Sequence, residues 1–251
     1  MKIKSKLTYD LFKLFPKKFL KLFNRFYDHK LSCNLLFLLK KDLKVEVVYD
    51  IGAFRGEWSS YLNKTSLKNK QFILFEANKE NEPYLKKEGF KYFIELLSNE
   101  EKDLKFYSQV STGDSYFLEQ TTFYKNNMDP QMIKATTLDN LVGKNNIPSP
   151  DFIKIDTQGS ELDILKGAKK TISDSSLLYL ECPIIEYNLG APNLNEYIEY
   201  LNSIDFIPYD ICEVHKIDNV LIQIDILFIK KSIFEKIHPG RKVLNIFNSR
   251  Q

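Results

Sequence analysis

The stretch that decides the fold is Val45-Glu46-Val47-Val48-Tyr49-Asp50-Ile51-Gly52-Ala53-Phe54-Arg55-Gly56. A β-branched, apolar run ends in an acid, a turn with two glycines follows, and a helical stretch begins at Glu57. Glycine is suited to such turns because it adopts backbone conformations that other residues rarely reach. A strand that passes through a glycine turn into a helix is typical of a parallel α/β sheet.

The same alternation continues along the chain. Further strands are expected at 71–76, 91–97, 151–156 and 177–181, and helices at 57–63, 160–170 and 195–202. Two last runs, 206–214 and 220–230, flank Asp218-Asn219, which predicts a terminal antiparallel hairpin. The sequence therefore predicts an α/β fold with a mostly parallel, doubly wound sheet and a C-terminal antiparallel hairpin.

Two segments depart from this rhythm. Residues 104–107 and 116–118 read as short strands of an inserted hairpin near 104–118 within a domain of residues 45–251. Residues 1–44 read as an N-terminal helical cap, with 12 Lys and Arg against three Asp. This segment either packs on the main domain or rests a basic amphipathic face on an anionic membrane or a partner, and the sequence leaves both interpretations open.

Composition excludes several classes of protein. The chain has 251 residues and a net charge of +3, which is too small for an obligatory nucleic-acid partner. Three cysteines without C-x-x-C spacing and three scattered histidines disfavour a disulfide scaffold, a zinc cage or a His-rich metal site. Lysines and Pro16 interrupt the N-terminal apolar residues, so no signal peptide is expected. Reduced thiols predict a cytoplasmic protein.

Acidic residues end four of the expected strands: Asp50, Glu76, Asp156 and Glu181. Ligands of open α/β sheets bind at the carboxyl ends of the strands. Glu76 follows Gly56 by 20 residues, the spacing of a carboxylate that accepts both hydroxyls of a ribose. The turn lacks G-x-G-x-x-G, and the acid before it suits the amino group of S-adenosylmethionine better than a pyrophosphate.

Four segments together resemble the FkbM family of S-adenosylmethionine-dependent methyltransferases. They are Val48–Ser59, Phe75–Asn81, Thr137–Leu141 and the long, most specific string Ile153–Ala168, and the resemblance spans roughly residues 45–231. It implies a Rossmann-like class I methyltransferase. It places the cofactor's methionine part near Asp50, Gly52, Ala53 and Gly56, its ribose near Glu76 and Ala77, and its adenine near Leu97 and Ser98.

The acceptor side of the site is expected around Asp156, Glu181 and Glu161. Methyl transfer mainly requires alignment of the nucleophile, and a hydroxyl also benefits from a base or a cation near its oxygen. These acids could bind the hydroxyl, act as base or share a divalent cation, although the sequence does not require a metal. They could instead brace the turn Thr157-Gln158-Gly159 and the following helix.

Three further residues are weighed for the site. Asp139 is predicted to cap a helix, Ser115 to line the pocket from the inserted hairpin, and His215 to be a satisfied side chain.

The expected function is O-methylation of a hydroxyl on a sugar, glycan or natural product. Two alternatives stay open: an NAD(P)-dependent oxidoreductase or epimerase, and a non-enzymatic, nucleotide-binding assembly protein at a membrane surface. The expected partner is a small-molecule or glycan acceptor, with peripheral contact to the inner face of a membrane through residues 1–44 as a further hypothesis. Oligomeric state is not indicated.

Overall fold

The computed structural model describes residues 30–108, 113–120 and 130–239. Most of the predicted N-terminal segment, residues 1–29, lies outside them. Within the described residues, no helix is both long and apolar enough to span a membrane. The helix at the start of the described chain, α3 (Lys30–Leu39), buries Leu31, Leu35 and Leu38 against the domain.

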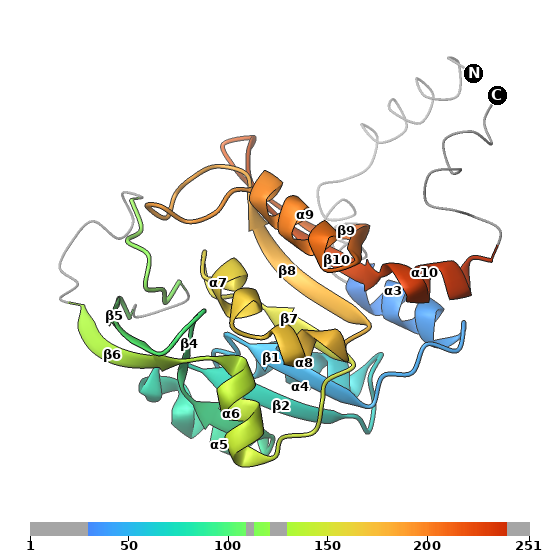
Figure 1. Ribbon diagram of the computed structural model, residues 1–251, viewed down its shortest axis with the longest axis horizontal. Coiled ribbons are helices and arrows are strands. Elements are labelled where there is room, and N and C mark those ends of the chain that lie inside the picture. The colour runs from blue at the N-terminus through green and yellow to red at the C-terminus, as the bar shows by residue number, and fades with distance from the viewer. Residues whose placement is uncertain (1–29, 109–112, 121–129, 240–251) are drawn as a thin grey trace, which may run out of the picture.

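A seven-stranded sheet in the order β3-β2-β1-β7-β8-β10-β9 forms the centre of the molecule (Figure 1). The first five strands in this order run parallel, and β10 is antiparallel to both of its neighbours, β8 and β9. The predicted doubly wound, Rossmann-like fold and its C-terminal hairpin are therefore confirmed. The strands are β1 (Val47–Ile51), β2 (Gln71–Glu76), β3 (Lys91–Ile94), β7 (Phe152–Ile155), β8 (Leu177–Pro183), β9 (Phe206–Ile217) and β10 (Val220–Lys230).

Two hydrophobic cores cover the two faces of this sheet, because alternate side chains of each strand point to opposite sides. One face, the near one in Figure 1, packs against α6 (Leu138–Asn145), α7 (Glu161–Lys166), α8 (Lys169–Ser173) and α9 (Leu194–Ser203). The other face packs against α3, α4 (Glu57–Lys64), α5 (Glu82–Glu88) and α10 (Lys231–Ile237). A short 3-10 helix, η1 (Lys79–Asn81), precedes α5.

A second, three-stranded sheet corrects the prediction for residues 91–118. The strand expected at 91–97 divides at Glu95, so that β3 joins the main sheet and β4 (Leu96–Leu97) the small one. There β5 (Lys102–Phe106) pairs with β6 (Gln131–Thr136), a strand that local patterning did not indicate. In the described part of the predicted hairpin, the pairing is a single antiparallel bridge between Tyr107 and Ser115.

The helix expected at 160–170 is two short helices, α7 and α8, separated at Gly167. A Cβ atom on Gly167 would lie 2.2 Å from the carbonyl oxygen of Ser98, so only glycine allows this approach. Ser160 occupies the N-cap position of α7, but its hydroxyl donates to the Thr157 carbonyl and caps nothing. The close packing of Gly167 against Ser98, which follows β4, thus accompanies the interruption between α7 and α8.

Candidate active site

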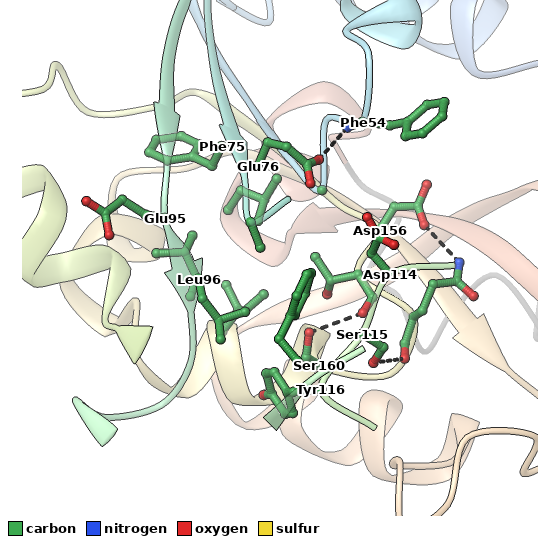
Figure 2. A pocket seen from close by; sticks show the side chains of 18 of the residues that line it. Phe54, Phe75, Glu76, Glu95, Leu96, Asp114, Ser115, Tyr116, Asp156 and Ser160 are labelled. Carbon is green, nitrogen blue, oxygen red and sulfur yellow. Dashed lines mark hydrogen bonds between the residues drawn. The ribbon is translucent and has the colours of Figure 1, made fainter. Parts of the chain in front are cut away.

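A cavity of about 290 Å³ lies at the carboxyl ends of β1, β2, β7 and β8. The strand order reverses direction between β1 and β7, and ligands of doubly wound sheets bind at such a switch point. Five carboxylates line the cavity, and Figure 2 shows four of them as labelled sticks. They are Glu76, Glu95, Asp114, Asp156 and Glu181.

The glycine turn after β1 forms one wall. Gly52 lines the cavity at φ +71°, and a Cβ atom there would lie 1.9 Å from the carbonyl oxygen of Asp156. Gly56 also has positive φ, and it packs against Leu74 at the start of α4 without reaching the cavity. The two glycines therefore have different roles. Gly52 allows the close approach of the chain after β1 to the chain after β7, and Gly56 forms the turn at the N-terminus of α4.

Glu76 ends β2 with its carboxylate directed at this turn (Figure 2). It accepts hydrogen bonds from the backbone N–H groups of Phe54 at 2.7 Å and Asn78 at 2.8 Å. Burial raises the pKa of Glu76 to about 7, the charge of Asp114 adds to the rise, and the two N–H donors oppose it. A fixed carboxylate at this place can accept hydrogen bonds from a diol.

Asp50 does not line the cavity. Its carboxylate is fully buried, accepts a hydrogen bond from Ser59 Oγ at 2.6 Å and lies 3.2 Å from Lys154 Nζ. Ala53 is likewise buried outside the lining. Any contact of Asp50 with a cofactor therefore runs through the turn that Asp50 supports.

Small and apolar residues bound the side of the cavity where the resemblance predicts the adenine. Ala77 and Leu97 line the cavity together with Leu96 and Phe106. Ser98, which was expected beside Leu97, is fully buried and lies outside the lining.

Asp156 follows β7 and faces the cavity from the side opposite Glu76 (Figure 2). Its Oδ2 lies 3.3 Å from Lys154 Nζ. Burial alone would raise the pKa of Asp156, but the ammonium of Lys154 holds it below its ordinary value. Burial would likewise lower the pKa of Lys154, yet Asp156 and Asp50 hold it above its ordinary value. Asp156 is therefore an ionised hydrogen-bond acceptor at neutral pH.

Glu181 lies beside Asp156, and its pKa is shifted in the opposite direction. Burial and the charge of Asp156 raise the pKa of Glu181 well above its ordinary value. Gln158 bridges the two acids, because its Nε2 donates to Asp156 Oδ1 at 3.2 Å and to Glu181 Oε2 at 2.8 Å. Tyr187 donates to the other oxygen of Glu181 at 2.9 Å. The network holds the two carboxyl groups side by side, with the pKa of Asp156 lowered and that of Glu181 raised.

Glu161 has a different place from the one expected for a catalytic acid. It is fully buried outside the cavity lining. Its carboxylate accepts hydrogen bonds from the backbone N–H groups of Thr157 and Gly159 and from Tyr197 Oη at 2.5 Å. These contacts are those of the bracing alternative, so Glu161 supports the turn that carries Asp156.

Of the three further residues weighed from the sequence, one lines the cavity and two lie outside its lining. Ser115 lines the cavity, and its Oγ donates to the Gln158 carbonyl at 2.9 Å. Asp139 is a cap, as expected, but for α8: its carboxylate accepts from Thr171 N at 2.8 Å and Lys170 N at 3.0 Å. His215 lies on β9, outside the cavity lining.

Sequence reasoning missed Lys154, Gln158 and Tyr187. Lys154 stands in the apolar run Phe152–Ile155, and a lysine in a buried strand must pair with acids. That signal was present in the sequence. Gln158 has φ +55° and Tyr187 comes from the chain after β8, so tertiary structure alone reveals their roles.

The residues of the cavity fall within one matched family domain. The family model described as "Methyltransferase FkbM domain" matches residues 50–208, more than half of the chain. This chain belongs to the FkbM methyltransferase family. The resemblance carried by the sequence motifs is thereby confirmed.

Solved structures with a similar fold include a methyltransferase FkbM from Methylobacillus flagellatus KT, with 19% identity and a TM-score of 0.49. It is matched over 72% of this chain, which spans only 43% of that protein. Magnesium protoporphyrin IX methyltransferase from Synechocystis PCC 6803, solved with bound S-adenosylmethionine, is 7% identical over 81% of this chain and 79% of its own, with a TM-score of 0.46. Curated protein sequences yield no significant match.

Proposed function

We propose that this FkbM-family chain is an S-adenosylmethionine-dependent O-methyltransferase acting on a hydroxyl of a sugar, glycan or natural product. One observation carries the proposal: a single cavity at the switch point has Glu76 on one side and the Asp156–Glu181 pair on the other. In this arrangement Glu76 would bind the ribose of the cofactor, and the Asp156–Glu181 pair would bind the acceptor in the same cavity.

The residues of the first side fit the cofactor. Gly52 leaves room where a side chain would collide with Asp156, Glu76 presents its carboxylate to the ribose hydroxyls, and Ala77 and Leu97 offer apolar surface to the adenine. S-adenosylmethionine, when bound, supplies a methyl group on a sulfonium. Asp50 supports the turn through Ser59 and Lys154.

The residues of the second side fit a neutral, hydroxyl-bearing acceptor. Ionised Asp156 accepts a hydrogen bond from a hydroxyl and draws its proton away from the developing ether oxygen. Glu181, which also lines the cavity, adds a second carboxyl group to this side. Five lining carboxylates, with Lys154 already paired to two acids, disfavour phosphorylated or carboxylated acceptors.

Hydride transfer is the weaker interpretation. A dinucleotide needs G-x-G-x-x-G for its pyrophosphate, and the turn here has Phe54 between Gly52 and Gly56. Phe54 uses its N–H to bind Glu76 and so commits that donor to the protein. Family membership also favours methyl transfer.

Calorimetric titration of the full chain with S-adenosylmethionine, NAD and NADP tests the cofactor. We expect binding of S-adenosylmethionine alone. Transfer of a labelled methyl group to a panel of neutral sugars, sugar phosphates and polyols then tests the acceptor, and labelling confined to phosphorylated or amine acceptors would contradict this part of the proposal. A cytoplasmic location and contact of residues 1–44 with a membrane remain predictions.

A further inference from the structure

A second group of chemically active side chains lies on the β9–β10 hairpin, outside the cavity lining. Glu213 and His215 stand two residues apart on β9, and Asp225 faces Glu213 across the antiparallel pair. Residues two apart on a strand point to the same face, so the hairpin brings three side chains together. In residues 30–108, 113–120 and 130–239, this is the one group of three His, Cys, Asp or Glu residues whose donor atoms lie within 4.8 Å of one another.

The distances match those between ligands of one metal ion. His215 Nε2 lies 3.4 Å from Asp225 Oδ1 and 3.6 Å from Glu213 Oε2. Donor atoms at about 2.1 Å from a tetrahedral ion lie about 3.4 Å from each other. The three side chains therefore need little movement to share an ion.

Two of these atoms are shielded from solvent and lack a hydrogen bond. Among the described residues, His215 Nε2 and Asp225 Oδ1 are buried at the atom level and make no hydrogen bond, and the contacts of Nε2 with Asp225 and Glu213 are ion pairs only when the imidazole is protonated. Buried polar atoms without partners are rare in folded proteins. Because the two atoms face each other, one cation between them would satisfy both.

Tyr179, on the neighbouring strand β8, orients the carboxylates of Asp225 and Glu213. Its buried hydroxyl donates to Asp225 Oδ2 at 3.1 Å and lies 3.4 Å from Glu213 Oε1. The bond to Oδ2 leaves Oδ1 as the free oxygen that faces His215. Outer hydrogen bonds of this kind commonly fix the ligands of metal sites.

The surrounding charge also favours a cation. Asp225 is paired in register with Glu181 on β8, whose neighbour Asp156 is ionised. Lys154, the cation beside Asp156, is already shared by Asp50 and Asp156. Glu213, Asp225 and Glu181 thus place three carboxyl groups side by side on the neighbouring strands β9, β10 and β8.

We propose that Glu213, His215 and Asp225 bind a first-row divalent cation of the zinc type. One imidazole and two carboxylates suit such an ion, and three protein ligands leave a fourth position open to water or an external ligand. The site is distinct from Asp156, Glu181 and Glu161, the acids for which the sequence leaves a shared divalent cation as one alternative. It does not depend on the proposed methyl transfer.

Calorimetry with the full chain, freed of metal by a chelator, tests the site with zinc, manganese and magnesium chlorides. We expect one zinc ion per chain, weaker manganese binding and the weakest response to magnesium. His215→Asn and Asp225→Asn should each weaken zinc binding about 100-fold or more, and Tyr179→Phe about tenfold. Glu199→Gln, an exposed acid on α9, and Cys33→Ser, an exposed thiol, should leave it unchanged.

Three outcomes would overturn the proposal: no zinc binding by the wild-type chain, undiminished binding by His215→Asn and Asp225→Asn, or loss of binding in Asp156→Asn alone. Thermal unfolding provides a second readout, because a bound ion raises the melting temperature. The rise should occur in the wild type and vanish in His215→Asn. His215 is partly exposed, so this variant keeps the test sound if Asp225→Asn folds poorly.

Discussion

The ammonium nitrogen of Lys154 lies 3.2 Å from a carboxylate oxygen of Asp50, in a pair from which solvent is excluded. The same nitrogen lies 3.3 Å from Asp156 and donates to the Gly52 carbonyl at 3.0 Å. One buried cation thus connects the glycine turn with Asp156 in the lining of the cavity.

Replacement of this cation should destabilise the fold strongly. In Lys154→Met, Asp50 keeps a buried charge without its partner, and the free energy of unfolding should fall by about 3–5 kcal/mol. Chemical denaturation measures the loss. Lys169→Met, at the exposed start of α8, is the matched control and should change little. The double variant Asp50→Asn/Lys154→Met should recover part of the loss, and equal losses in single and double variants would show that the ion pair is not the cause.

Substitution of Asp156 should separate catalysis from folding. Asp156→Asn keeps the size of the side chain and removes its charge, so turnover should fall roughly 10²-fold while cofactor affinity stays near that of the wild type. Initial rates and cofactor titrations of the same preparation measure both. A lower melting temperature with normal turnover would instead assign Asp156 a bracing role.

Glu76 should make cofactor binding depend on pH. Its pKa of about 7 means that the carboxylate is fully available only above neutrality, so affinity for S-adenosylmethionine should weaken as the pH falls from 8 to 6. Glu76→Gln should lose roughly 1–3 kcal/mol of binding and most of this pH dependence. Titrations at several pH values provide the measurement, and an unchanged affinity in the variant would contradict the ribose assignment.

Stability of the ligand-free protein should show the opposite trend. A carboxyl whose pKa is raised by folding stabilises the fold at low pH, and this contribution is lost as the pH rises through about 7. Relative to the wild type, Glu76→Gln should therefore gain up to about 3 kcal/mol at pH 8 and little at pH 5. Melting temperatures of the two proteins from pH 5 to pH 8 measure this difference, and a difference that does not change with pH would contradict the prediction.

Two glycines with nearly equal φ allow a controlled test of the turn. Gly52 has φ +71° and a colliding Cβ position, whereas Gly89 has φ +78° and no atom within 4 Å of that position. Gly89→Ala should cost about 1 kcal/mol of backbone strain. Gly52→Ala should cost more than about 4 kcal/mol or prevent folding, because β1 and β7 must separate. Similar losses in the two variants would show that strain, not the close approach, requires Gly52.

Site residues could be located from the sequence where their position follows from the local strand pattern. Asp50, Glu76, Asp156 and Glu181 could be placed because parallel strands end at a common edge, so position along the chain gives position in space. Their environments could not be predicted, since burial and pairing come from other strands. Asp50 was therefore expected at the ligand and lies behind the turn instead.

The helix and sheet errors have the same physical origin. Glu161 is acidic and begins a helix, a pattern that does not reveal how completely backbone N–H groups and Tyr197 occupy its oxygens. The pairing of β5 with β6 joins distant residues and is set by the tertiary fold, so local alternation suggested a nearer partner. The metal-type group on β9 and β10 escaped notice because its single histidine carries no sequence spacing rule.

After β3 the chain leaves the main sheet and forms the small sheet before it returns, and this excursion can vary separately from the main sheet. Leu96 and Ala135, at the two ends of the small sheet, are paired in register, so the segment between them leaves and returns at one place. This segment carries Asp114, Ser115 and Tyr116 to the cavity, whereas the main-sheet strand ends carry Glu76 and Asp156. Residues 97–134 are thus a cassette with adjoining ends. Exchange of this cassette between relatives should alter the part of the lining formed by Asp114, Ser115 and Tyr116, and with it Leu97 and Phe106, while Glu76 and Asp156 are inherited from the recipient scaffold.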